Sequence, residues 1–133
     1  MSASNTVMLI GNLTDEPTLR ETGTGRSVVN FRIAANDVSY RNGERVERTE
    51  YTNVVAWNAQ AENVAVSCKK GTRVMVQGRL QQRKATVNGK DAYFTEIVAD
   101  EVGLALRWQM ATDVQKHNTA AGKLVDEDEM AAA

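Results

Sequence analysis

Residues 72–84 read TRVMVQGRLQQRK, and they alternate more regularly between apolar and polar side chains than any other part of the chain. Successive side chains of a β-strand point to opposite faces. One predicted face holds Val74, Val76, Gly78 and Leu80, and the other holds Arg73, Arg79 and Arg83, separated by Met75, Gln77 and Gln81. Lys84 follows, and the run contains no carboxylate. The stretch predicts a strand with a core face and a basic face, the latter being either a track for a polyanion or an ordinary solvated surface.

The size and composition indicate a single small domain. The chain has 133 residues, is 42% hydrophobic and carries a net charge of −1, which argues against a simple basic nucleic-acid binder. The charge is unevenly distributed, because residues 1–109 hold 14 Lys and Arg against 12 Asp and Glu, whereas residues 110–133 hold 2 against 5. The single cysteine, Cys68, cannot form an internal disulfide and is expected to be a small buried side chain in a helix. No signal peptide or membrane span is predicted, and a chain with a single cysteine fits a reducing cytosol, so we expect a cytoplasmic protein.

Other segments also read mainly as strands. We expect strands over residues 6–13, 27–36, 45–57 and 91–99, a helix over 59–70, and one more short strand within 103–108. Turn signals separate them in the glycine-rich segment 21–26, at Asn42-Gly43 and at Asn88-Gly89. Lys69 and Lys70 followed by Gly71 are typical of a helix end.

The order of these segments predicts an all-β fold. Five short strands with a helix between the third and fourth are the layout of an OB-fold barrel, although a β-sandwich or an α+β sheet has the same elements. We expect this domain to span residues 1–109. Residues 110–133, which include the acidic run 126–129, are expected to form a flexible tail.

The residues that carry most catalytic chemistry are scarce. His117 is the only histidine and lies in the predicted tail, no Cys/His cluster has metal-ligand spacing, and no phosphate-loop or nucleophile-elbow motif occurs. We therefore expect no enzyme activity, no metal and no cofactor.

The few aromatic residues stand beside basic ones. Tyr51 and Trp57 are six residues apart on one strand and therefore share a face, while the opposite face, with Val54 and Ala56, is apolar enough to be the buried one. Tyr40 lies beside a polar loop. Aromatic rings interleaved with Arg and Lys are the combination that binds single-stranded nucleic acid, since bases stack on the rings and cations contact the phosphates.

Five motifs together resemble the bacterial single-stranded DNA-binding protein family, over residues 6 to about 108. They are IGNL (10–13) with EPTLR (16–20), VNFRIA (29–34), EYTNVVAW (50–57), KGTRVMVQGRL (70–80) and Arg83-Lys84. The segments Asp100-Glu101-Val102-Gly103 and Leu106-Arg107-Trp108 are similar to actinobacterial members. The resemblance implies a homotetramer that binds and protects single-stranded DNA without sequence preference during replication, recombination or repair.

The resemblance also implies roles for individual residues. Tyr40, Tyr51 and Trp57 match stacking aromatics, and Lys70, Arg83 and Lys84 match cationic contacts to the DNA backbone. Arg20 matches a family arginine, and Arg73 and Arg79 join the predicted phosphate contacts through the basic strand face.

Several departures from the family keep a second interpretation open. Ala85 stands where many relatives carry a stacking tryptophan, and the acidic tip lacks the Pro-Phe ending through which replication and repair proteins would be recruited. The chain could instead be an accessory oligomeric subunit that mainly contacts proteins and has weak nucleic-acid affinity. The residues do not distinguish DNA from RNA.

Overall fold

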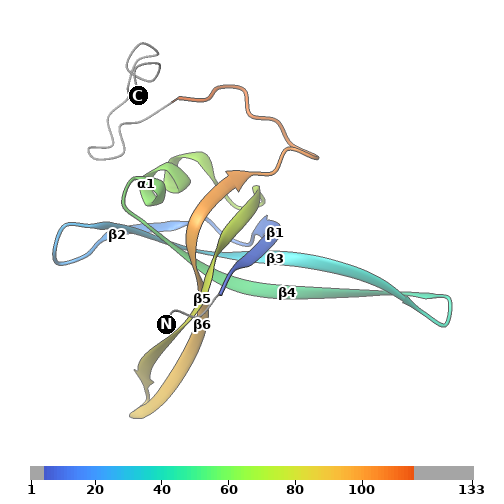
Figure 1. Ribbon diagram of the computed structural model, residues 1–133, viewed down its shortest axis with the longest axis horizontal. Helices are drawn as coiled ribbons and strands as arrows, with labels where there is room; N and C mark the ends of the chain where they lie inside the picture. Colours follow the sequence, from blue (N-terminus) through green and yellow to red (C-terminus); the bar gives the residue numbers. More distant parts are fainter. Residues whose placement is uncertain (1–4, 116–133) are drawn as a thin grey trace.

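The computed structural model describes residues 5–115, and the acidic run 126–129 lies outside the described residues. Seven elements follow one another along the chain (Figure 1): β1 (Val7–Leu13), β2 (Thr18–Glu21), β3 (Ser27–Arg41), β4 (Glu44–Trp57), α1 (Asn58–Ser67), β5 (Arg73–Val87) and β6 (Lys90–Leu104). No helix among residues 5–115 is long and apolar enough to cross a membrane.

The strands form a closed mixed barrel. Their hydrogen-bonded order is β1-β5-β6-β4-β3, and β1 also pairs with β3 at its end, which closes the sheet. The pairing of β4 with β6 is parallel and the other pairings are antiparallel. Because α1 lies between the third and fourth barrel strands, the predicted five-stranded, OB-like barrel is confirmed. The short β2 extends the sheet beyond β3 and was not predicted.

The core is built from the alternation that the sequence shows. The six largest fully buried side chains fill the barrel: Val29, Ile33, Val54, Val74, Val76 and Ile97. The helix α1 contributes Ala61 and Val64 to this cluster. The predicted inner face of β5 is therefore correct at Val74 and Val76, but Leu80 is 44% exposed because β5 continues past the core there.

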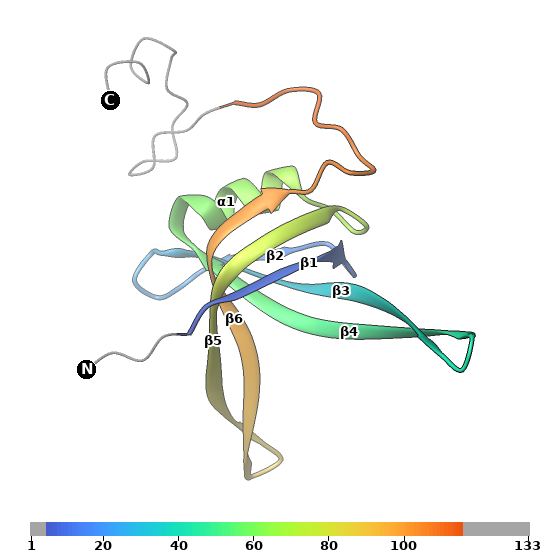
Figure 2. The ribbon, with the colours of Figure 1, turned by 45° about the vertical axis from the view of Figure 1, so that its right-hand side comes forward.

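Two long hairpins project from the barrel (Figure 2). One consists of the outer parts of β3 and β4 and the other of the outer parts of β5 and β6; we call them the β3–β4 arm and the β5–β6 arm. Their turns are Asn42-Gly43 (φ 51° and 79°) and Asn88-Gly89 (φ 53° and 76°). Positive φ at both central residues is the geometry of the tight turn that Asn-Gly predicts. Each arm is a two-stranded ribbon, so most of its side chains face solvent.

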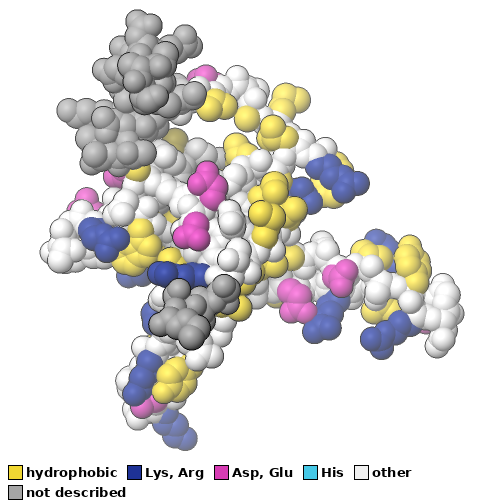
Figure 3. Space-filling view, viewed as in Figure 1, with side chains coloured by type: hydrophobic (Ala, Val, Ile, Leu, Met, Phe, Trp, Pro, Cys, Tyr) yellow, Lys and Arg dark blue, Asp and Glu magenta, His cyan; other side chains and the backbone are white. Residues whose placement is uncertain are grey.

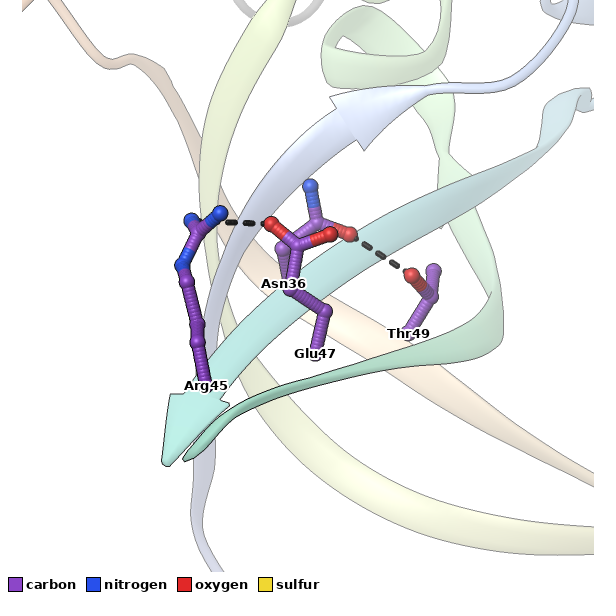
Figure 4. A network of polar contacts seen from close by, with 4 residues as sticks. All are labelled: Asn36, Arg45, Glu47 and Thr49. Atoms are coloured by element: carbon purple, nitrogen blue, oxygen red, sulfur yellow. Dashed lines mark hydrogen bonds and ion pairs between the residues drawn. The ribbon is translucent and has the colours of Figure 1, made fainter. Parts of the chain in front are cut away.

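Polar side chains hold the β3–β4 arm together. Thr49 donates a hydrogen bond of 2.8 Å to the Asn36 side chain directly opposite on β3, and Arg45 forms a 2.9 Å ion pair with Glu47 (Figure 4). A further ion pair of 2.7 Å joins Arg48 to Glu50. These arginines are thus already neutralised by carboxylates of the arm.

Four predicted segments had wrong boundaries. The helix spans 58–67 rather than 59–70, so Lys69 and Lys70 lie in the following turn and not in the last helical turn. The strand predicted at 27–36 extends to 41, because the β3–β4 arm continues where the apolar pattern fades, and the strand predicted at 91–99 extends to 104, where it pairs with the start of β5 in the barrel. Residues 103–108 are not a separate strand, since Leu104 ends β6 and a turn follows.

Cys68 is buried directly after the helix rather than within it. Its side chain is 5% exposed and belongs to the core cluster. Burial raises the pKa of the Cys68 thiol, because the thiolate would be poorly solvated there. The residue is therefore a small apolar core group, as expected.

Candidate nucleic-acid interface

One side of the sheet, pointing away from the core, carries most of the predicted site residues. We call it the outer face. Paired residues share a face of a sheet, and the register thus places these side chains together: Thr18 and Arg20; Val28, Asn30 and Arg32; Tyr51, Asn53, Val55 and Trp57; Phe94, Glu96 and Val98; and Arg79, Gln81 and Arg83. One row crosses five strands, from Arg79 through Val98, Val55 and Asn30 to Thr18.

Both predicted stacking rings of the barrel lie on this outer face, each beneath an arginine. Tyr51 is 59% exposed, and the guanidinium of Arg32 lies 4.7 Å from its ring centroid. Trp57 is partly buried, outside the core cluster, with the guanidinium of Arg26 4.5 Å from its ring centroid. Arg26 Nε also donates a 3.3 Å hydrogen bond to the Asn58 side chain. Such stacks orient the rings and place positive charge beside them.

Asn58 explains how Arg26 is held at Trp57. It has a φ of 61°, a left-handed conformation that asparagine adopts more readily than most residues. This conformation turns the chain from β4 into the helix directly after Trp57. It leaves the amide oxygen of Asn58 in reach of the β2–β3 hairpin, from which Arg26 projects.

Arg20 is held on the outer face by a neighbouring amide. The side-chain oxygen of Asn30, in the amide orientation that satisfies both groups, accepts hydrogen bonds from Arg20 Nε at 3.3 Å and Nη2 at 2.9 Å. An amide leaves the guanidinium charge uncompensated, so Arg20 keeps its positive charge available to an anion.

A groove of about 360 Å³ crosses the outer face. Its walls include Asn30, Arg32, Asn53, Arg83, Phe94 and Glu96, and also Asp15 and Glu16. Glu96 is the one buried charged residue of the described chain, at 8% exposure, and its carboxylate lies 3.8 Å from Arg83 Nε. The groove is therefore polar and of mixed charge, with basic and aromatic side chains beside carboxylates.

Of the predicted site residues, only Arg83 lines this groove; Arg20, Tyr51, Trp57 and Arg79 share the outer face with it, and four others lie elsewhere. Tyr40 is 71% exposed near the tip of the β3–β4 arm. Lys84 is on the opposite side of the β5–β6 arm from Arg83, in a 3.1 Å ion pair with Asp91. Lys70 lies in the turn after the helix, where its backbone N–H donates to Glu16, and Arg73 begins β5, beside Trp108. The space-filling view shows basic side chains spread over the barrel and both arms rather than in one patch (Figure 3).

Sequence reasoning missed two arginines of this site, Arg26 and Arg32. Arg32 alternates with the buried Phe31 and Ile33, a pattern that indicates an outward side chain but not which ring it meets. Arg26 lies in a turn, 31 positions before Trp57 in the numbering, and no local signal relates the two residues. Within the described part of the chain, no three His, Cys, Asp or Glu side chains group as metal ligands.

Comparison with known proteins agrees with this architecture. The pattern of the "Single-strand binding protein family" matches residues 4–105. The chain is 39% identical over 115 residues to the single-stranded DNA-binding protein of Paenarthrobacter aurescens, covering 84% of this chain and 67% of that protein. It is 37% identical over 126 residues to the single-stranded DNA-binding protein of Mycobacterium leprae, covering 92% of this chain and 74% of that protein. It is 40% identical over 99 residues to the single-stranded DNA-binding protein B of Bacillus subtilis, covering 74% and 87%. The chain therefore belongs to the single-strand binding protein family, a family of DNA-binding proteins rather than enzymes, and its relatives include actinobacterial members.

Proposed function

We propose that this protein binds single-stranded DNA without sequence preference through the outer face and protects it during replication, recombination or repair. The observation that carries the proposal is the register, which puts Tyr51 and Trp57 on the same face as Arg20, Arg32 and Arg79. Rings on this face offer stacking surfaces to any base, and the guanidiniums offer contacts to any phosphate. None of these groups requires a particular base, so binding is indifferent to sequence.

In this proposal the bound DNA strand runs across the barrel between the two arms. Arg20, Arg79 and Arg83 contact phosphates there, while Tyr40, Lys70 and Lys84 make outlying contacts at the arm ends and the turn after the helix. The binding unit is the domain of residues 1–109. A protein with this role acts where DNA is, which places it in the cytoplasm with the nucleoid.

A matched pair of tyrosines tests the role of the outer face. Tyr51→Ala should weaken binding of a fluorescently labelled oligo-dT by about 1–3 kcal/mol, the usual contribution of one stacked base. Tyr93 is similarly exposed, at 66%, but lies on the opposite side of its arm, beside the outlying Lys84, so Tyr93→Ala should weaken binding much less than Tyr51→Ala. Equal losses in the two variants, or none in either, would contradict stacking on the outer face.

Assembly is a separate part of the proposal. Met8, Ile10 and Met75 are 57%, 40% and 38% exposed, and Ile10 lies directly opposite Met75 on the side of β1 and β5 away from the core. Along residues 7–11, β1 pairs with β5 at one edge only among the described residues. An open strand edge beside an apolar surface favours contact with another copy. We infer a homotetramer, with the number four taken from the family resemblance; a stable monomer in analytical ultracentrifugation at micromolar concentration would contradict it.

The alternative is an accessory oligomeric subunit that mainly contacts proteins. Two ion pairs favour it, because Glu96 and Asp91 already compensate the charges of Arg83 and Lys84. In that case the protein would assemble normally, while oligo-dT would fail to change either its tryptophan fluorescence or its sedimentation.

A further inference from the structure

Trp108 is a large aromatic side chain that the outer face does not explain. It follows β6, is 71% exposed and lies beside two guanidiniums. The guanidinium carbons of Arg73 and Arg107 are 4.5 Å and 4.7 Å from its ring. Arg73 comes from the start of β5, so two segments of the chain build this group. We call these three residues the Trp108 cluster.

The backbone around the Trp108 cluster is fixed by Gln109. Its side-chain oxygen accepts from the Arg73 N–H at 3.0 Å, and its side-chain nitrogen donates to the carbonyl oxygens of Arg73 at 2.6 Å and Ala105 at 2.9 Å. Ala105 is buried, and its N–H donates to the Arg73 carbonyl at 3.0 Å. The start of β5 and the segment after β6 are thereby joined next to Trp108. A group held in place before binding loses little conformational entropy when a ligand arrives.

The arginines of the Trp108 cluster also differ from three arginines of the arms. Among residues 5–115, neither Arg73 nor Arg107 forms an ion pair, whereas Arg45, Arg48 and Arg83 all do. An exposed indole beside two guanidiniums that form no ion pair within residues 5–115 offers a stacking surface to a base, and the guanidiniums offer cations to the neighbouring phosphates. This is the chemistry of a single-stranded nucleic-acid contact.

We propose that the Trp108 cluster is a second single-stranded nucleic-acid contact, separate from the groove on the outer face; this rests on the proposed function. The separation follows from β5, on which Arg73 precedes Arg83 by ten residues, or about 33 Å of strand at about 3.3 Å per residue. A short oligonucleotide held in the groove therefore does not reach Trp108. A longer strand, after leaving the groove of the same or a neighbouring copy, stacks a base on it.

The two tryptophans of the chain allow each site to be observed alone. In the full-length protein, Trp57→Phe leaves Trp108 as the only tryptophan, and Trp108→Phe leaves Trp57. Each variant is titrated with oligo-dT of about 4 and about 16 nucleotides, the range of lengths that one barrel of this type occupies. We expect the long oligonucleotide to quench the tryptophan fluorescence of both variants. The short one should quench only the variant that retains Trp57. Circular dichroism checks that both variants are folded.

An arginine pair provides the affinity control. Arg107→Ala should weaken binding of the long oligonucleotide by about threefold or more and leave the short one unaffected, as expected for a lost cation at an aromatic contact. Arg48→Ala removes an arginine that is already paired with Glu50, and it should change the affinity for neither oligonucleotide.

Three results would overturn the proposal in distinguishable ways. If Trp57 is quenched but Trp108 never is, the outer face binds DNA and the Trp108 cluster does not. If the emission of Trp108 changes with protein concentration in the absence of DNA and not with DNA, the Trp108 cluster is a contact between copies. If neither tryptophan is quenched at any length, the proposed function is wrong as well.

Discussion

Arg26 should strengthen the binding of a base to Trp57. In the free protein its guanidinium covers one side of the indole at 4.5 Å and is held there by the Asn58 amide. A base can then stack on the other side of the ring, so that the indole lies between the base and the guanidinium. We therefore expect Arg26→Ala to weaken oligo-dT binding, and Arg26→Lys to weaken it less.

The size of this effect follows from the exposure of the site. Arg26 is exposed, and a cation over an aromatic ring contributes about 0.5–1 kcal/mol at such positions, or about a two- to fivefold change in affinity. If the guanidinium also contacts a phosphate, Arg26→Ala should reduce the slope of log affinity against log salt by about 0.7. Lysine keeps the charge and so should keep the slope, while the planar stacking is lost.

The assay is a titration of Trp57 fluorescence in a Trp108→Phe background, at two or more salt concentrations. Arg48→Ala in the same background is the control, because that arginine is paired with Glu50 on the other arm face. Tighter binding by Arg26→Ala would refute the reasoning, since it would mean that Arg26 competes with the base for the ring.

Three further changes test other features of the structure. Gly78→Ala should lower the free energy of unfolding by about 1–3 kcal/mol, because its Cβ would collide with the Val98 carbonyl oxygen beside the irregular pairing of β5 and β6; an unchanged urea midpoint would contradict this. Glu96→Gln removes the carboxylate next to Arg83 and should tighten oligo-dT binding at low salt by about two- to fivefold; the reasoning is wrong if affinity falls or stays the same. Cys68 should react slowly with a thiol reagent at pH 8 in the folded protein and rapidly in urea, since burial favours the neutral thiol and raises its pKa. Equal rates in the two states would show that Cys68 is accessible in the folded protein. Burial of the neutral thiol stabilises the fold fully below the ordinary thiol pKa, and this stabilisation is lost as the pH rises above it.

The barrel was predictable because every second side chain along its strands is buried. Val74 and Val76, or Val54 and Ala56, mark a core face that the structure confirms at near-complete burial. The arms were harder to predict, since both of their faces meet solvent and the apolar alternation that defines a strand disappears after about residue 36. Only the two Asn-Gly turns indicated where the arms reverse.

The candidate site was predictable as a set of residue types but not as an arrangement. Alternation placed Arg73, Arg79 and Arg83 on one side of β5, yet the length of the strand separates Arg73 from the groove and brings it to Trp108. The arginines over Trp57 and Tyr51 come from a neighbouring hairpin and strand, so their contacts depend on the register between strands. No pattern within a single segment contains that information.

The central claim is that single-stranded DNA lies on the outer face of the barrel. The most direct test is a nitrogen-15 NMR titration of the assigned protein with oligo-dT. We predict that the largest shifts occur at the Trp57 indole and at the amides of Asn30, Asn53 and Arg79, with no change at Val66 on the exposed side of the helix. Shifts confined to the helix, with an unchanged outer face, would contradict the account.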